Sequence, residues 1–157
     1  MSDFYQTGVV ATFHKLGTLN LEKIEAELTW YSQERPIALV LPSLYSELQG
    51  EALKGIVREL KTVKYIKEIV VALGPATEEE FKYAKEFFSV LPQKTRIIWN
   101  SGARITDIYR TVESSELPTG EQGKGKSAWL AYGYVLSQQE FHAIALHDCD
   151  ILTYKRD

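Results

Sequence analysis

Hydrophobic positions along this chain follow two periods, one typical of buried strands and one of helices. Continuous apolar runs predict strands at 37–41, 66–73, 96–99 and 143–146. Between them, apolar residues recur every three or four positions, which predicts amphipathic helices. These helices are expected after Asn20, from Ser46 through about Leu60, after Thr77, around 105–112 and from Ser127 to Gln138.

Residues at the ends of these segments predict where the elements start and stop. Asn20 is a suitable N-cap for the first helix, which should end before Pro36. Pro42 is expected to end the first strand. Ser46-x-x-Gln49 and Thr77-x-x-Glu80 both fit the capping box, in which two side chains satisfy free backbone N–H groups at a helix start.

Strands that alternate with helices predict an α/β fold, a Rossmann-like open parallel sheet with flanking helices. In such sheets the ligand crevice lies at the carboxyl ends of the strands. The loops expected there are 42–47, 73–77, 100–104 and 147–150, with the turn 123–126 able to reach the same edge. We divide the chain into a helical lead-in, residues 1–35, and an α/β unit, residues 36–157.

Composition narrows the class of protein. The 157 residues, of which 45% are hydrophobic and 25% charged, suit one globular domain of ordinary size. A net charge of -3 and scattered Lys and Arg residues argue against nucleic-acid binding. The single cysteine excludes an internal disulfide and a CxxC zinc framework. No apolar run has the length of a membrane span and no signal-peptide pattern is present, so we expect a cytoplasmic protein.

The tetrapeptide His147-Asp148-Cys149-Asp150 directly follows the last predicted strand. Asp148 and Asp150 can converge on one Mg²⁺ or Mn²⁺ ion, which would neutralise a bound diphosphate. The alternative is a strand-end turn with two solvated acids. For Cys149 we favour packing against the strand end over metal ligation, because thiolates prefer softer metals. For His147 we favour a packed side chain over a ligand or base.

The segment Gly123-Lys124-Gly125-Lys126 is the second chemical motif. Its glycines permit close approach of the backbone to a ligand, and Lys124 can reach a phosphate group. The alternative is a solvated loop with a positive tip. The glycine spacing of a Walker loop is absent. The preceding polar stretch, 114–125, is long enough to be functional or disordered.

The remaining histidines and the tryptophans are given structural interpretations. His14 and His142 have no acidic or cysteine neighbours at ligand spacing, so we interpret them as ordinary surface or core residues. Trp99 and Trp129 lie at strand and helix spacing, which favours the core over stacking on a nucleotide base.

Three segments in this order resemble the GT-A glycosyltransferases, in particular the glucosyl- and mannosyl-3-phosphoglycerate synthase group. They are V-L-P-S-L-Y-S-E at 40–47, G-K-G-K at 123–126 and H-D-C-D at 147–150. The resemblance implies that Asp150 and Asp148 hold the metal and that Lys124 lies near the nucleotide sugar. The nucleotide-sugar site it implies comprises Pro42, Ser43, Leu44, Ser46, Glu47, Leu73, Gly74, Lys124, Asp148, Cys149 and Asp150.

This resemblance also implies an activity. It is the transfer of glucose, or alternatively mannose, from UDP-glucose or GDP-mannose to 3-phosphoglycerate, with Mg²⁺ or Mn²⁺ as cofactor. GT-A enzymes continue well beyond their metal motif, so we interpret 36–157 as a half-domain truncated after the Asp-x-Asp motif. Its acceptor site would then lie in missing residues, and the chain alone should be inactive. An uncovered sheet edge would favour a homo-oligomer.

Two departures from the family pattern leave other classes open. Ala72-Leu73-Gly74-Pro75-Ala76-Thr77 replaces the usual acidic, Ser/Gly-rich segment after the second strand, and Tyr45-Ser46 replaces Asn-Glu after the first. A nucleotidyltransferase-like enzyme shares the sheet and the paired acids but would carry a Gly-rich loop after the first strand. A non-catalytic domain that binds Mg²⁺ or nucleotide would normally place its acids where this chain has Pro42-Ser43.

Overall fold

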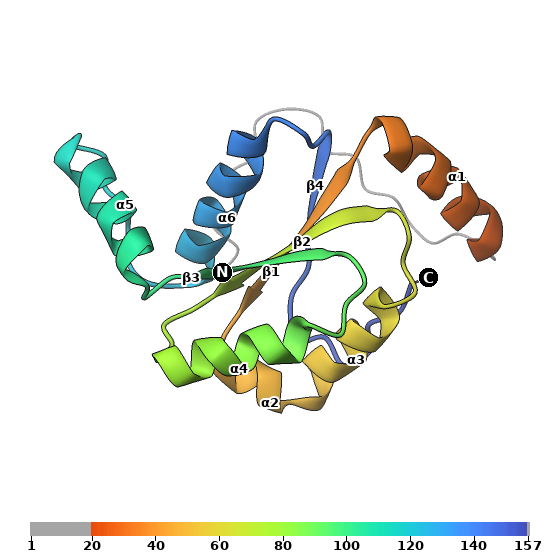
Figure 1. The fold of residues 1–157 in the computed structure, drawn as a ribbon, viewed down its shortest axis with the longest axis horizontal. Coiled ribbons are helices and arrows are strands. Elements are labelled where there is room, and N and C mark those ends of the chain that lie inside the picture. The colour runs from red at the N-terminus through yellow and green to blue at the C-terminus, as the bar shows by residue number, and fades with distance from the viewer. Residues whose placement is uncertain (1–19, 157) are drawn as a thin grey trace, which may run out of the picture.

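Four parallel strands form one open sheet in the computed structural model, which describes residues 20–156 (Figure 1). The strands are β1 (Ile37–Ser43), β2 (Ile66–Leu73), β3 (Lys94–Trp99) and β4 (Ala143–Leu146). Their order across the sheet is β3-β2-β1-β4, and every neighbouring pair is parallel. The predicted α/β class and parallel sheet are therefore confirmed.

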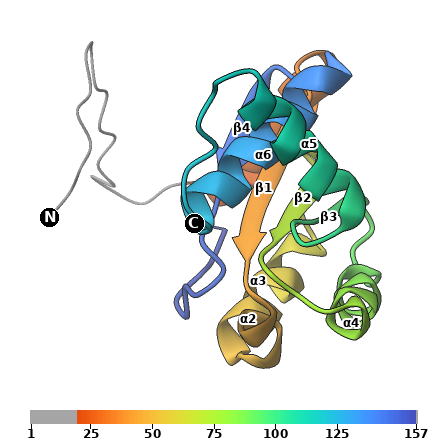
Figure 2. The same ribbon diagram turned by 90° about the vertical axis from the view of Figure 1, so that its left-hand side faces the viewer.

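Helices cover both faces of this sheet (Figures 1 and 2). They are α1 (Leu21–Glu34), α2 (Tyr45–Gln49), α3 (Glu51–Leu60), α4 (Glu78–Phe88), α5 (Ala103–Ser114) and α6 (Lys124–Gln138). Helices α2, α3 and α4 lie on one side and α6 on the other, while α5 projects from the body at the left of Figure 1. None of these described helices combines the length and the apolar character needed to cross a membrane.

The sheet separates two apolar clusters because successive strand residues point to opposite faces. Leu39, Leu41 and Ile69 are fully buried against α3 and α4. Val40 and Val70 are fully buried on the other face, against α6. Full burial of a side chain of this size contributes roughly 1.5–3 kcal/mol each to stability. The continuous apolar runs of β1 and β2 therefore reflect burial on both faces, as predicted, whereas the edge strand β4 has no buried residue.

β1 continues past Pro42 to Ser43, two residues further than the sequence predicted. The carbonyl of Val40 accepts a hydrogen bond from the His147 N–H at 3.1 Å. The backbone N–H and C=O groups of every second residue of β1, counted from Val40, therefore face β4. Pro42 has the same parity, but β4 has already ended at Leu146. The missing N–H of Pro42 therefore removes no hydrogen bond of the sheet ladder, and the strand tolerates it.

The predicted helix from Ser46 to Leu60 is two helices, and its predicted capping box is wrong. Gly50 has an extended backbone conformation and separates α2 from α3. Helix α2 begins after Leu44, whose N–H donates to the Glu47 carboxylate at 2.8 Å. The side chain that accepts the capping hydrogen bond is thus that of Glu47, not that of Gln49. Ser46 lies inside the first turn with an exposed side chain.

Two other helix starts follow the sequence closely. Thr77 and Glu80 form the predicted reciprocal capping box, with distances of 2.7 and 3.2 Å between donor and acceptor. The Asn20 side chain accepts from the Lys23 N–H at 3.0 Å, as an N-cap does. β3 begins at Lys94, two residues before its apolar run, because polar residues can occupy the exposed end of an edge strand.

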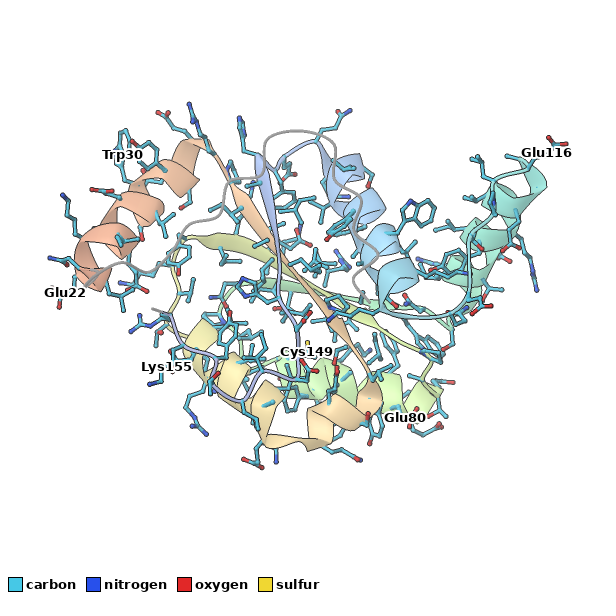
Figure 3. All side chains as sticks on the ribbon, turned by 180° about the vertical axis from the view of Figure 1, so that it is seen from behind. Glu22, Trp30, Glu80, Glu116, Cys149 and Lys155 are labelled. Atoms are coloured by element: carbon cyan, nitrogen blue, oxygen red, sulfur yellow. The ribbon has the colours of Figure 1, made fainter. Side chains whose placement is uncertain are left out.

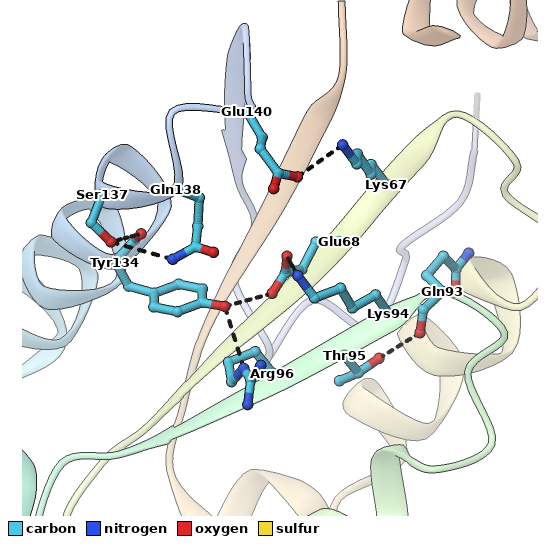
Figure 4. Close-up of polar contacts among 10 residues, drawn as sticks. All are labelled: Lys67, Glu68, Gln93, Lys94, Thr95, Arg96, Tyr134, Ser137, Gln138 and Glu140. Atoms are coloured by element: carbon cyan, nitrogen blue, oxygen red, sulfur yellow. Dashed lines mark hydrogen bonds and ion pairs between the residues drawn. The ribbon is translucent and has the colours of Figure 1, made fainter.

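A buried carboxylate lies at the amino-terminal end of β2 (Figure 4). Glu68 is fully buried, and its Oε1 accepts a hydrogen bond from the Tyr134 hydroxyl at 2.9 Å. The Lys94 ammonium lies 2.7 Å from its Oε2, and this hydrogen bond raises the pKa of Lys94. Arg96 donates to the Tyr134 hydroxyl at 3.3 Å. Helix α6 is thereby bonded to β2 and β3 away from the carboxyl ends of the strands.

Replacing Tyr134 by Phe should lower the free energy of unfolding by about 2 kcal/mol, since hydrogen bonds to charged groups contribute roughly 1.5–3 kcal/mol. Urea denaturation measures the change. Tyr132→Phe is the matched control, because Tyr132 packs on the same cluster and its hydroxyl makes no hydrogen bond with residues 20–156. Equal effects of the two substitutions would show that the Glu68 contact contributes nothing.

Candidate nucleotide site at the strand ends

A cavity of about 200 Å³ opens at the carboxyl ends of β1 and β2, where the crevice of an open parallel sheet is expected. Its walls come from three segments far apart in the sequence: the end of β1 with α2, the turn after β2, and the start of α6. The lining residues are Pro42, Ser43, Leu44, Glu47, Gly74, Pro75, Gly123, Lys124 and Ser127. Six of these are predicted site residues, and Pro75, Gly123 and Ser127 are additional.

Gly74 lets the turn after β2 pass close to the start of α2. A Cβ atom at this position would lie 2.8 Å from Cδ2 of Leu44 and 3.5 Å from the Ser43 carbonyl oxygen. The Gly74 N–H donates to that same carbonyl at 2.8 Å, which extends the β1–β2 pairing into the cavity wall. A side chain here would push the half-exposed Leu44 side chain aside and change the shape of the cavity.

Five predicted site residues do not line this cavity: Ser46, Leu73, Asp148, Cys149 and Asp150. The Leu73 side chain is fully buried in the cluster under α3 and α4, because strand alternation points it away from the carboxyl-end opening. Its carbonyl accepts from the Asn100 N–H at 3.1 Å. Ser46 is exposed on α2. Glu47 does line the cavity, with its carboxylate bonded to the Leu44 N–H.

Lys124 is the first residue of α6, whereas the sequence predicted a turn over 123–126 and a helix from 127. Gly123 is the N-cap residue and supplies no capping side chain. The Lys124 ammonium contacts Oδ1 of Asp148, and this hydrogen bond raises the pKa of Lys124. An ion pair therefore joins the segment 123–126 to the segment 147–150, with both side chains about half exposed.

Asp148 and Asp150 lie in the turn after β4, at the same edge as the cavity. Asp150 is exposed, and its carboxylate makes no hydrogen bond or ion pair with the described residues. Residues 20–156 contain no group of three or more His, Cys, Asp or Glu side chains arranged around a common metal position. The chain thus offers two carboxylates at this turn, one paired with Lys124 and one open to solvent.

Cys149 points in the opposite direction from its two acidic neighbours. It is 2% exposed and belongs to the apolar cluster under α3 and α4, and Figure 3 shows it in the interior of the molecule. Burial, reinforced by the nearby Glu47 charge, raises the pKa of its thiol to about 12. Only the thiolate form of cysteine ligates metal ions, and this buried thiol is protonated at neutral pH. The packed interpretation of Cys149 is confirmed.

His147 is half-buried, and its Nδ1 lies 2.7 Å from the Tyr154 hydroxyl. Burial lowers the pKa of His147, so the neutral ring is favoured. Tyr154 packs against the cluster that contains Cys149. The packed interpretation of His147 is confirmed, and the contact fixes one side of the turn that carries Asp148 and Asp150.

The other aromatic and histidine residues divide between core and surface. Trp99 stacks on Phe81, with ring centroids 4.9 Å apart, and donates from Nε1 to the Ala76 carbonyl at 2.8 Å. Trp129 is 51% exposed on α6, so its predicted place in the core is wrong. His142 is exposed, and His14 lies outside the described residues.

Asn100 and Ser127 join β3 to α6 behind the cavity, and the sequence reasoning selected neither residue. Asn100 is 5% exposed, and its Nδ2 donates to Oγ of Ser127 at 2.6 Å. Asn100 directly follows a predicted strand, so its position among the carboxyl-end loops could be predicted from the sequence. Its contact with Ser127 could not be predicted, because the two residues are far apart in the sequence and meet only through the packing of α6 on the sheet.

An open, all-parallel sheet with flanking helices and a strand-end cavity is the architecture expected of the N-terminal half of a GT-A glycosyltransferase. No protein-family model matches the chain. The chain is 43% identical over 157 residues to a glucosyl-3-phosphoglycerate synthase of Persephonella marina. This alignment covers 100% of this chain and 39% of that protein. It is 33% identical over 156 residues to a glucosyl-3-phosphoglycerate synthase of Methanococcoides burtonii, which covers 99% of this chain and 38% of that protein.

The chain is therefore a homologue of glucosyl-3-phosphoglycerate synthases over a shared region of about two fifths of their length. This finding agrees with the resemblance carried by the three sequence motifs. The shared region includes the cavity and the turn with Asp148 and Asp150, since the alignment with the Persephonella protein spans all 157 residues.

The buried thiol gives a direct test of how the turn with Asp148 and Asp150 is packed. Cys149 should react with a thiol reagent at pH 8 at least about tenfold more slowly in the folded protein than in urea, because its pKa of about 12 leaves little thiolate. Absorbance of the released chromophore measures the rate. Rapid labelling of the folded protein would place Cys149 at the surface and contradict this packing.

Proposed function

We propose that the cavity and the adjoining turn bind a nucleotide diphosphate sugar. The observation that carries this proposal is the ion pair between Lys124 and Asp148 at the mouth of a cavity formed by strand ends. Pro42, Leu44 and Pro75 provide apolar surface for a base or ribose, and Lys124 provides a cation for the diphosphate. The volume of about 200 Å³ suits part of a nucleotide, with the phosphates reaching outward to the acids.

The two acids fit a divalent metal ion that is completed by the ligand. Mg²⁺ prefers oxygen ligands and is usually bound by one or two carboxylates together with substrate phosphates and water. The absence of a three-residue cluster in residues 20–156 supports a shared metal–diphosphate site over an all-protein cage. When bound, the ion would supply positive charge to the leaving diphosphate. Asp150 is the better ligand, because Lys124 already neutralises Asp148.

For the complete enzyme we propose transfer of glucose from a nucleotide donor such as UDP-glucose to 3-phosphoglycerate. The two curated relatives support this activity by their names, and the chain spans about two fifths of their length. Residues 1–157 alone are then expected to bind donor without transferring sugar, and GDP-mannose is the less favoured donor. Calorimetric titration with UDP, GDP and ADP sugars, each with and without Mn²⁺, tests the donor class.

Binding of UDP should depend on a divalent metal and should be weakened more by Asp150→Ala than by Asp148→Ala. Loss of an outer-shell partner commonly costs about 10–100-fold in metal affinity, so loss of a direct ligand should cost at least about tenfold. Calorimetry in Mn²⁺ and in chelator measures both effects. Asp107→Ala, which removes an exposed acid of α5 and changes the net charge equally, is the control. Unchanged affinity in chelator would refute the metal role.

Lys124→Ala should weaken UDP binding about tenfold or more and leave uridine binding nearly unchanged. The reason is that an ammonium contacts phosphate and not base, and a charged hydrogen bond contributes roughly 1.5–3 kcal/mol. Competition titrations with UDP and uridine measure the preference. Lys126→Ala is the matched control, because Lys126 is engaged with the Thr119 hydroxyl and the Tyr109 ring. Losses of equal size for both ligands would mean that Lys124 only shapes the cavity.

A further inference from the structure

We propose that Asn100 is a positioning residue of the donor site: through Ser127 it fixes the first turn of α6 and so the place of Lys124. The inference rests on the proposed function, in which Lys124 contacts the diphosphate. Asn100 itself does not line the cavity. It acts from the end of β3, on the far side of β2 from β1.

A chain of hydrogen bonds leads from the sheet to the residue before Lys124. The Asn100 N–H donates to the Leu73 carbonyl at 3.1 Å, which anchors Asn100 to the end of β2. Its Nδ2 donates to Oγ of Ser127 at 2.6 Å. The Ser127 hydroxyl in turn donates to the Gly123 carbonyl at 3.1 Å, and the Ser127 N–H donates to the same oxygen at 3.1 Å.

The direction of these bonds sets the orientation of the Asn100 amide. A hydroxyl has one proton, and that of Ser127 is given to the Gly123 carbonyl. Ser127 can therefore only accept from Asn100, which requires the NH₂ group to face it. The Asn100 Oδ1 is left buried without a hydrogen-bond partner among residues 20–156.

The bond between the Asn100 amide and the Ser127 hydroxyl is buried, so it holds both groups in one arrangement. What the amide achieves is local order at the start of α6. Gly123 has no side chain to cap the helix, and a Cβ placed on it would meet nothing within 4 Å. The paired donors of Ser127 are thus the bonds that hold the Gly123 carbonyl, and Asn100 holds the Ser127 hydroxyl in place.

A positioning role and a purely structural role predict different results. If Asn100 and Ser127 place Lys124, their loss should reduce the preference for UDP over uridine, because Lys124 contacts only phosphate. If the role is purely structural, the substitutions should lower the affinities for UDP and uridine equally, or change only the stability of the protein. Asn100→Leu removes the amide and the unpaired acceptor together, and Ser127→Ala removes the hydroxyl.

The experiment measures the ratio of UDP to uridine affinity in these two variants, with and without Lys124→Ala. Each variant should lower the ratio about three- to tenfold, the range of one net hydrogen bond, and neither should lower it further in the Lys124→Ala background. Gln93→Leu is the control, because it removes a different side-chain amide. The Gln93 amide is half-buried and donates to the Leu60 and Val63 carbonyls at 2.7 Å. Gln93→Leu should lower stability and leave the ratio unchanged.

Hydrogen exchange of the Ser127 amide gives a second readout that needs no ligand. Asn100→Leu should speed this exchange about three- to tenfold relative to amides in the middle of α6. If Lys124→Ala lowers the ratio and the Asn100 and Ser127 variants do not, the positioning role is overturned and the proposed function stands. If the unmodified chain shows no preference for UDP, the proposed function fails, and unchanged exchange in Asn100→Leu would overturn the positioning role as well.

Discussion

The unequal length of β1 and β4 is the constraint on which the site depends. β1 pairs with β2 up to Ser43, but its pairing with β4 ends where Val40 meets Leu146. Past that point the chain of β4 turns away, and the end of β1 has a hydrogen-bonded neighbour on one side only. The turn with Asp148 and Asp150, the first residues of α2 and the first turn of α6 all meet beside this free end. Pro42 is compatible with this geometry because it has no N–H to leave unpaired.

The turn after β4 contains one side chain that packs in the core, Cys149, between two acidic side chains that do not. Cys149 and Tyr154 are held in the apolar cluster under α3 and α4, while the two acids face the opening. The buried residues give the turn a fixed place, and the exposed residues are left free to interact. The same separation holds for Leu73 and Gly74, of which one is core and the next is cavity wall.

Much of the fold was predictable because its signals are local. Four apolar runs gave the strands, and the Thr77–Glu80 capping box depends on residues three apart. The errors arose where a longer-range effect decided the outcome. Lys124 is helical because α6 packs on β1 and β2, and Trp129 is exposed on α6 although its helical spacing favoured the core. Six of the nine cavity residues were predicted, five from motifs and Gly74 from its place after a strand, whereas Ser127 and its contact with Asn100 required the packed structure.

The contact between Lys124 and Asp148 has a consequence for how binding would respond to salt. Without ligand, Lys124 and Asp148 already neutralise each other, while the exposed Asp150 keeps an unpaired charge beside them. When a metal–diphosphate complex enters on the proposed function, the carboxylate exchanges its lysine for the metal and the lysine exchanges its carboxylate for phosphate. The number of ion pairs contributed by these two residues increases by one, not two. The ionic-strength dependence of affinity should therefore be shallower than the formal charges of the site suggest.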